Sequence, residues 1–143
     1  MNIHYRRITK KEELEESKKL RFRVFIQEQH IPEDLERDEL DARSMHVTAI
    51  VDGRIVGTGR ITLKGDTATI SRIAVEKNYR RMGIGTHIMQ ELEDIAKHKQ
   101  VKTVTLSSNF QSISFYQTLA YTKKGAPFIE CGGEVQKMVK MIT

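Results

Sequence analysis

Cysteine, tryptophan and proline are scarce in this sequence of 143 residues, which contains one Cys, no Trp and two Pro. The lone Cys131 cannot form an internal disulfide, and this excludes the small secreted scaffolds that disulfides hold together. The five histidines show no HExxH pattern and no spacing paired with a second cysteine. The usual sequence basis for a zinc site is therefore missing, and we expect no metal.

Long apolar runs are absent as well. The longest, such as the one around Met45 to Val51, span only a few residues, whereas a membrane helix needs about 20 in a row. The first residues, MNIHYRRITKKEE, are charged throughout and lack the apolar core of a signal peptide. We therefore expect a cytoplasmic protein without a membrane partner.

The chain also lacks internal repeats and any Gly/Ser-rich or Pro-rich linker. Its length corresponds to about one ordinary domain, and 38% hydrophobic residues can fill a core. We predict a single domain over residues 1–143.

Positive charge predominates, since 24 Lys and Arg outnumber 19 Asp and Glu and give a net charge of +5. This favours an anionic partner, such as nucleic acid, anionic lipid or a polyphosphate cofactor. The cations are scattered, however, and neither a basic tail nor an aromatic RNA-binding motif is present. We therefore expect no nucleic-acid partner.

The first third of the chain predicts a strand, a helix and an acidic loop. A strand over Ile3 to Ile8 is followed by Thr9, a plausible N-cap, with Glu12 placed to complete a capping box. The helix ends near Gln29, because the residue before a proline is driven out of helical geometry. The segment Pro32 to Ser44 is too charged to be core, so we expect a solvated loop with room for a short helix. The alternative for its acidic stretch from Glu33 to Asp41 is a cradle for a cationic amine.

A β-meander follows. Met45 to Val51 and Arg54 to Leu63 are joined by Asp52-Gly53, a dipeptide suited to a type I′ hairpin turn, and Ala68 to Val75 adds a third strand. Within the second strand, Gly57-Thr58-Gly59 indicates a bulge or close packing. A dinucleotide fingerprint is excluded, because Thr62 stands where the third glycine would be.

The second half of the chain alternates helices and strands. Apolar residues recur at intervals of three and four from Gly85 to Lys99, which predicts an amphipathic helix. Further predictions are strands at Lys102–Leu106, Tyr121–Lys124 and Val135–Ile142, with a short helix at Ser112–Leu119. This order implies an α/β fold, a mixed sheet with helices on both faces.

The segment Ile70 to Thr86 has the layout of an anion site. A strand ends at Val75, and a helix begins after Gly83 and Gly85. A helix N-terminus exposes backbone N–H groups with partial positive charge, and the glycines let a phosphate approach the backbone. Arg80 and Arg81 add charge beside it. The alternative is a glycine-rich entry turn with arginines in solvent.

Two motifs resemble the GNAT superfamily of N-acetyltransferases. Arg80-x-x-Gly83-x-Gly85 is similar to its acetyl-coenzyme A motif, Q/R-x-x-G-x-G/A. Downstream, Leu106-Ser-Ser-Asn109 followed by Ser114-Phe-Tyr-x-x-x-Ala-Tyr121 resembles its strand with Asn and its FYxxxGF/Y element. The resemblance covers essentially the whole chain. The chain also resembles the small bacterial ElaA-like (YjcF-like) branch of this superfamily, in the patterns Phe25-x-x-Glu28-Gln29 and Glu36-x-Asp38-x-x-Asp41 and in His46.

The resemblance implies a single GNAT-like domain whose sheet is mixed, mostly antiparallel and splayed between its central strands. It implies transfer of an acetyl group from acetyl-coenzyme A, the cosubstrate, to a primary amine of a small molecule or peptide. The backbone near Ile73 or Ala74 would polarise the thioester carbonyl, and Tyr116 matches the family's general acid. The implied coenzyme-binding residues are Ile73, Ala74, Val75, Arg80, Arg81, Met82, Gly83, Ile84, Gly85, Thr86, Asn109 and Tyr116.

The acceptor side is less defined. Many GNAT enzymes carry a glutamate on the strand before the glycine motif, where this chain has Ser71-Arg72, so the general base is unassigned. A water relay or an amine that arrives neutral is an alternative to a side-chain base. The candidate acceptor-binding residues are Glu28, Asp38, Asp41 and His46. Relatives carry an E-x-G-I-P-H segment where this chain reads Glu130-Cys-Gly-Gly-Glu-Val135, and we assign Cys131 no catalytic role.

Alternative functions remain open from the sequence. The chain also resembles acyl-homoserine-lactone synthases in Arg21-x-x-Val24-Phe25 and in Glu36, Asp38 and Asp41, although it lacks the tryptophan of those enzymes. The absent strand glutamate favours a catalytically silent acyl-coenzyme A-binding regulator. The acceptor amine and the oligomeric state are undetermined, a homodimer being one option.

Overall fold

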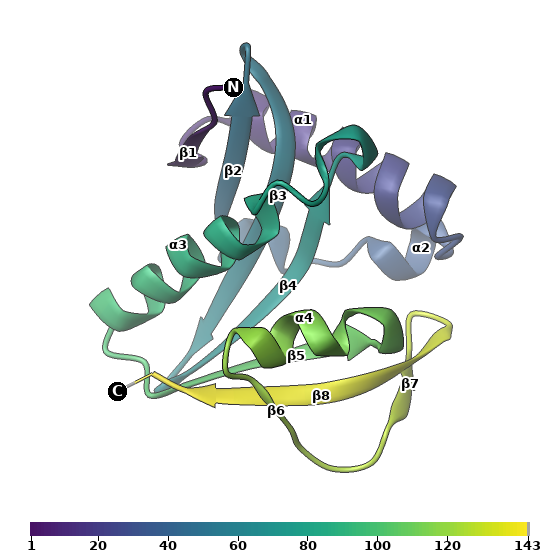
Figure 1. Cartoon of the computed structure of the whole chain (residues 1–143), viewed down its shortest axis with the longest axis vertical. Coiled ribbons are helices and arrows are strands. Elements are labelled where there is room, and N and C mark those ends of the chain that lie inside the picture. Colours follow the sequence, from purple (N-terminus) through teal and green to yellow (C-terminus); the bar gives the residue numbers. More distant parts are fainter. Residues whose placement is uncertain (143) are drawn as a thin grey trace.

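The computed structural model describes residues 1–142, which form one mixed sheet with helices around it (Figure 1). In chain order the elements are β1 (His4–Arg7), α1 (Lys11–Arg21), the π-helix η1 (Phe22–Glu28), α2 (Glu33–Glu36), η2 (Asp41–Arg43), β2 (Met45–Val51), β3 (Arg54–Lys64), β4 (Thr67–Val75), η3 (Lys77–Tyr79), α3 (Ile84–His98), β5 (Thr103–Asn109), η4 (Phe110–Ser112), α4 (Ile113–Thr118), β6 (Thr122–Lys123), β7 (Phe128–Glu130) and β8 (Gly133–Met141).

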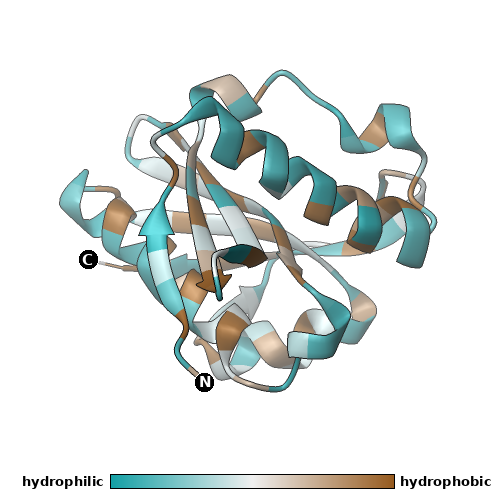
Figure 2. Cartoon of the chain, turned by 90° about the horizontal axis from the view of Figure 1, so that it is seen from above, coloured by the Kyte–Doolittle hydropathy of each residue, from teal (hydrophilic) through white to brown (hydrophobic). Residues whose placement is uncertain are grey.

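The strand order is β1-β2-β3-β4-β5-β8-β6, with β7 beside β8. Within residues 1–142, β4 and β5 are the only strands that pair in parallel, and every other pairing is antiparallel. Helices α1 and α3 cover opposite faces of β3, and Figure 2 shows the sheet lying between helices. The predicted fold class, a mixed and mostly antiparallel sheet with helices on both faces, is confirmed. No helix within residues 1–142 is both long and apolar enough to cross a membrane.

The two central strands separate after a short pairing. β4 and β5 are paired only from Thr67 to Thr69 on β4, whereas β3 follows β4 as far as Val75. In Figure 1 the two strands leave a common region and diverge. A bulge adds to the divergence: Arg72 has a φ of 58°, and two residues of β4 stand opposite Gly59 of β3. The predicted splay is therefore present, and it leaves one edge of β4 without a neighbouring strand.

Glycines in β3 explain how closely α3 packs on the sheet. A Cβ at Gly59 would lie 2.5 Å from the Ile73 side chain and 2.9 Å from Ile88, and one at Gly57 would lie 2.9 Å from Ile84. Both predicted reasons for these glycines, a bulge and close packing, are confirmed. The side of α3 that faces them carries the fully buried Ile88 and Leu92, as the three- and four-residue periodicity predicts.

Several boundaries and one environment differ from prediction. The first helix is capped by Glu13 rather than by a Thr9–Glu12 box: its Oε1 accepts the backbone N–H of Lys10 and of Thr9, both at 3.1 Å. The helix continues as a π-helix to Glu28. The prediction of a wholly solvated acidic loop is wrong, because Glu36 is only 8% exposed. Strand β7 was not predicted.

Candidate functional site

The turn before α3 presents a row of free backbone N–H groups. Gly83 is the N-cap, in the left-handed region at φ 80°, and no side chain caps the helix. The first helical bond runs from His87 N to Gly83 O at 3.0 Å. Within residues 1–142, the N–H groups from Arg81 to Thr86 donate to no protein acceptor. Such groups at a helix start bind anions, so the predicted anion site has the required geometry.

The two glycines of the turn serve different purposes. A Cβ at Gly83 would meet no atom within 4 Å, so the positive φ, and not crowding, requires glycine there. A Cβ at Gly85 would lie 3.4 Å from Cζ of Phe115, which is ordinary contact. The space at Gly83 is therefore open to a ligand as bulky as a phosphate, whereas the Cβ position of Gly85 faces Phe115.

Arg80 is held by the protein rather than free in solvent. Its guanidinium binds both carboxylate oxygens of Glu28, at 2.5 and 2.6 Å, and its Nε donates to Val75 O at 3.0 Å. The hydrogen bonds from Arg80 lower the pKa of Glu28. This ion pair ties η1 to the start of the turn. Arg81, at φ 63°, is exposed.

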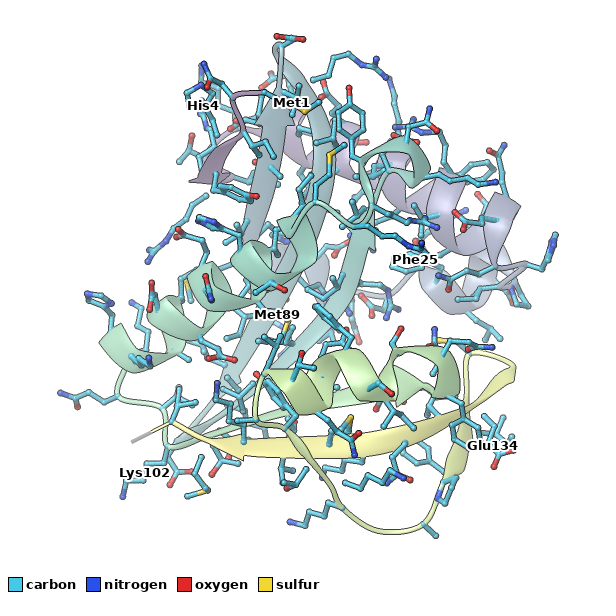
Figure 3. The ribbon with its side chains drawn as sticks, in the orientation of Figure 1. Met1, His4, Phe25, Met89, Lys102 and Glu134 are labelled. Atoms are coloured by element: carbon cyan, nitrogen blue, oxygen red, sulfur yellow. The ribbon has the colours of Figure 1, made fainter. Side chains whose placement is uncertain are left out.

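A cavity of about 720 Å³ lies where β4 and β5 diverge. Its walls come from Ile70 to Ile73 of β4, Leu106 to Asn109 of β5, the start of α4, and the turn between β7 and β8. Figure 3 labels Phe25, on the wall formed by η1, and Glu134, on the opposite wall formed by β8. The unpaired edge of β4 thus borders a partly open cavity large enough for a small-molecule substrate.

Tyr116 and Asn109 both line this cavity. Burial raises the pKa of Tyr116 to about 12, so the phenol stays protonated at neutral pH. Its ring packs against Phe115 and Tyr121, with centroids at 5.0 and 6.1 Å. Asn109 Oδ1 accepts the N–H of Ser112 at 3.0 Å and thereby caps the turn that leads into α4. The structure therefore brings these two sequence-predicted residues to one volume.

The four candidate acceptor-binding residues lie elsewhere. Glu28, Asp38, Asp41 and His46 are not among the residues that line the cavity in the described part of the chain. His46 is buried, its Nε2 lies 2.9 Å from Asp41 O, and burial lowers its pKa. The structure gives each of these side chains a protein partner instead.

Asp38 and Asp41 belong to a network of three carboxylates and three guanidinium groups. Arg60 binds Asp38 at 2.6 Å and Asp41 at 2.8 Å, and Arg21 binds Asp41 at 2.9 Å. Burial alone would raise the pKa of Asp41, but the two guanidinium groups outweigh it and hold that pKa below its usual range. The network also includes Glu36 and Arg72, so the charged residues of the resemblance to acyl-homoserine-lactone synthases, Arg21, Glu36, Asp38 and Asp41, all belong to it, whereas Val24 and Phe25 are buried in an apolar cluster.

Sequence reasoning missed Glu36 as a cavity residue. Glu36 and Arg72 line the cavity together with Cys131 of the β7–β8 turn. The Cys131 thiol lies 3.5 Å from Leu35 O, and burial raises its pKa. Two signals for Glu36 were available: its place in the Glu36-x-Asp38-x-x-Asp41 pattern, and an acidic loop in a chain that also has isolated arginines within its strands.

The model of the Acetyltransferase (GNAT) family matches residues 11–121. Among similar sequences, YyaT of Bacillus subtilis (strain 168) is 38% identical over 146 residues, covering 100% of this chain and 97% of that protein. The N-acetyltransferase YjcF of the same strain is 33% identical over 110 residues, covering 77% of this chain and 79% of YjcF.

Solved structures share the fold. Escherichia coli ElaA superposes with a TM-score of 0.85 at 22% identity, covering 97% of this chain and 99% of ElaA. The PaiA N-acetyltransferase of Thermoplasma acidophilum, solved in complex with coenzyme A, has a TM-score of 0.77 at 19% identity, covering 99% and 100%.

Proposed function

Because the chain belongs to the Acetyltransferase (GNAT) family, we propose that it transfers an acetyl group from acetyl-coenzyme A to a primary amine of a small molecule or peptide. The observation that carries the proposal is the row of N–H groups from Arg81 to Thr86, which have no acceptor within residues 1–142 and stand at the start of helix α3. The complex of PaiA with coenzyme A supports the same ligand chemistry in this fold.

The proposed coenzyme site has two parts. Backbone N–H groups from Arg81 through Met82, Gly83, Ile84 and Gly85 to Thr86 hold the diphosphate, with the α3 dipole adding partial positive charge. Arg80 shapes this turn through its bonds to Glu28 and Val75. The pantetheine arm lies along the free edge of β4, where alternate backbone groups of Ile73, Ala74 and Val75 bond to its amides as a further strand would. Asn109 borders the arm from β5.

The reaction is a direct displacement at the thioester carbonyl. The neutral amine nitrogen bonds to the carbonyl carbon, and the carbonyl oxygen gains negative charge that a backbone N–H near Ile73 stabilises. When the carbon–sulfur bond breaks, the electron pair stays on sulfur. The nitrogen loses one proton and the sulfur gains one, so the products are an amide and a free thiol.

Tyr116 stabilises the departing sulfur by hydrogen bonding. Its pKa of about 12 exceeds that of a thiol, about 8.5, by roughly 3.5 units, which opposes complete proton transfer from the phenol by about 5 kcal/mol. The phenol therefore donates its proton to the sulfur only while it accepts a proton from the amine nitrogen. That nitrogen becomes much more acidic once it is bonded to the carbonyl carbon. We assign no side chain as general base, and the amine enters uncharged at the reacting nitrogen.

Substitution of the turn glycines tests the proposal. Gly83→Glu or Gly85→Glu places a carboxylate where the diphosphate would lie, and loss of two charge-assisted hydrogen bonds lowers affinity on the order of 100-fold or more. The matched control is Gly53→Glu, since Gly53 also has a positive φ, 77°, with open space around it, in the β2–β3 turn. Titration calorimetry with acetyl-coenzyme A is the measurement. Equal affinity in the Gly83 and control variants would refute the proposed site.

A further inference from the structure

One part of the cavity is acidic although the chain as a whole is positive. The charged residues that line it are Glu36, Glu130, Glu134 and Arg72, in a protein of net charge +5. Glu130 and Glu134 are exposed and form no ion pair within residues 1–142. Arg72 is already engaged, its donors binding Glu36 and Asp38. A positively charged group entering the cavity therefore meets carboxylates that lack a cation.

Glu36 differs from an ordinary buried acid because only one of its oxygens is used. Its Oε2 accepts from Arg21 at 2.6 and 3.1 Å and from Arg72 at 3.1 Å. Its Oε1 has no hydrogen-bond partner within residues 1–142, although the residue is only 8% exposed. Every fully buried side-chain nitrogen or oxygen in the described chain has a partner. The free oxygen is therefore not fully buried, and Glu36 is one of the residues that line the cavity.

The surroundings hold this oxygen in place. Two guanidinium groups fix the opposite side of the carboxylate, and the Arg72 guanidinium also binds Glu36 O at 2.8 Å. A carboxylate with one oxygen fixed and the other unpaired at the border of a cavity can accept from a cation, because a partly desolvated acceptor gains most from a charged donor. Phe25 and Ile31 line the same space and offer an apolar surface.

We propose that the acceptor is a cationic diamine, with a primary amine that reacts and a second, non-reacting ammonium that donates to Oε1 of Glu36. This proposal rests on the proposed function, since it concerns the acceptor part of the same cavity. Phe25 and Ile31 contact the methylene chain between the two nitrogens. Glu130 and Glu134 attract the diamine, whose far ammonium stays charged while the reacting nitrogen is neutral, and they disfavour amines that carry a carboxylate.

Calorimetry on the full chain saturated with coenzyme A tests this inference without requiring turnover. The probes are 1,4-diaminobutane, n-butylamine and 4-aminobutanoate, which share the primary amine and differ in the charge of the far end. The diamine is expected to bind roughly tenfold or more tightly than n-butylamine, as one charged hydrogen bond would give, and 4-aminobutanoate least tightly. Thiol release with acetyl-coenzyme A should give the same order in kcat/KM.

The decisive variant is Glu36→Gln, read as the ratio of diamine to n-butylamine affinity. The amide oxygen keeps the arginine bonds and turns the amide nitrogen, a donor, toward the cavity, so the ratio falls to about one. Glu93→Gln is the matched control, because Glu93 is similarly buried but both its oxygens are paired, with Tyr121 at 2.8 Å and Lys140 at 2.9 Å. That control lowers stability and keeps the ratio of the wild type.

The outcomes separate the two proposals. If acetyl-coenzyme A fails to bind the wild type, the proposed function is wrong. If it binds and the diamine shows no advantage over n-butylamine, only the diamine inference is overturned. An advantage that survives Glu36→Gln would also overturn it, since the second ammonium would then rest elsewhere. A loss of folded protein lowers the binding of both amines equally, so it cancels in the ratio of their affinities. A merely structural contribution of Glu36 would therefore leave this ratio unchanged.

Discussion

Tyr116→Phe removes one oxygen from the cavity and leaves the packing of the ring intact. The ring contacts with Phe115 and Tyr121, at 5.0 and 6.1 Å between centroids, do not involve the hydroxyl. Loss of a positioned proton donor costs roughly 10²- to 10⁴-fold in rate. We expect kcat to fall by at least about 100-fold, while the affinity for acetyl-coenzyme A measured by calorimetry stays that of the wild type.

The pH dependence of this variant is the sharper measurement. Burial disfavours the charged phenolate and raises the pKa of Tyr116 to about 12, so at pH 9 about one molecule in a thousand has lost the donor proton, against about one in ten for an unperturbed tyrosine. Thiol release is measured from pH 7 to 10 for both proteins. Ionisation of the acceptor amine changes both rates by the same factor, so its effect cancels in the ratio of the two rates.

That ratio should stay flat across the range. A ratio near one would remove Tyr116 from the chemistry. A ratio that declines with a midpoint near pH 10 would show an exposed, ordinary phenol and would contradict the burial on which the reasoning depends. Circular dichroism of the variant is the control for folding.

Two further predictions concern stability, both measured by urea denaturation. Gly83→Ala forces a side chain into the left-handed region at φ 80° and should lower the free energy of unfolding by about 1–2 kcal/mol, whereas an unchanged midpoint would contradict the conformation assigned to the turn. Arg60→Met leaves Asp38 and Asp41 with fewer partners and should cost about 3–5 kcal/mol. Because their pKa values are lowered in the folded state, their contribution is present above about pH 4 and is lost as pH falls through the folded pKa. Acid should therefore destabilise the wild type more than Arg60→Met, and parallel pH profiles would argue against the network.

Local patterns predicted the sheet, the long helix and the glycine turn before that helix well. The period of α3 and the turn residues Asp52-Gly53 are properties of adjacent residues, and the turn has the predicted positive φ values of 49° and 77°. The family and its YjcF-like branch were also identified correctly from short motifs. Such features are determined by a few residues that are neighbours in the chain, so a single sequence holds all the information needed to predict them.

The acidic loop shows what one sequence does not contain. Glu36 lies 15 residues from Arg21 and 36 from Arg72 in the chain, and neither spacing has a period that links them. Counting charges therefore indicated a solvated loop, although the charges neutralise one another inside the fold. Strand β7 was missed for a related reason: its three residues are all exposed, so no hydrophobic alternation identifies it.

The pairing between β4 and β5, hereafter the seam, is only three residue pairs long, and it links the stability of the folded protein to its ligand. Under the proposed function the pantetheine arm supplies hydrogen bonds that the seam lacks, so the coenzyme joins the two halves of the sheet. A ligand at 100 times its dissociation constant adds about 2.7 kcal/mol to stability. Scarcity of acetyl-coenzyme A would then expose the protein to faster proteolysis, and its abundance would follow the carbon supply.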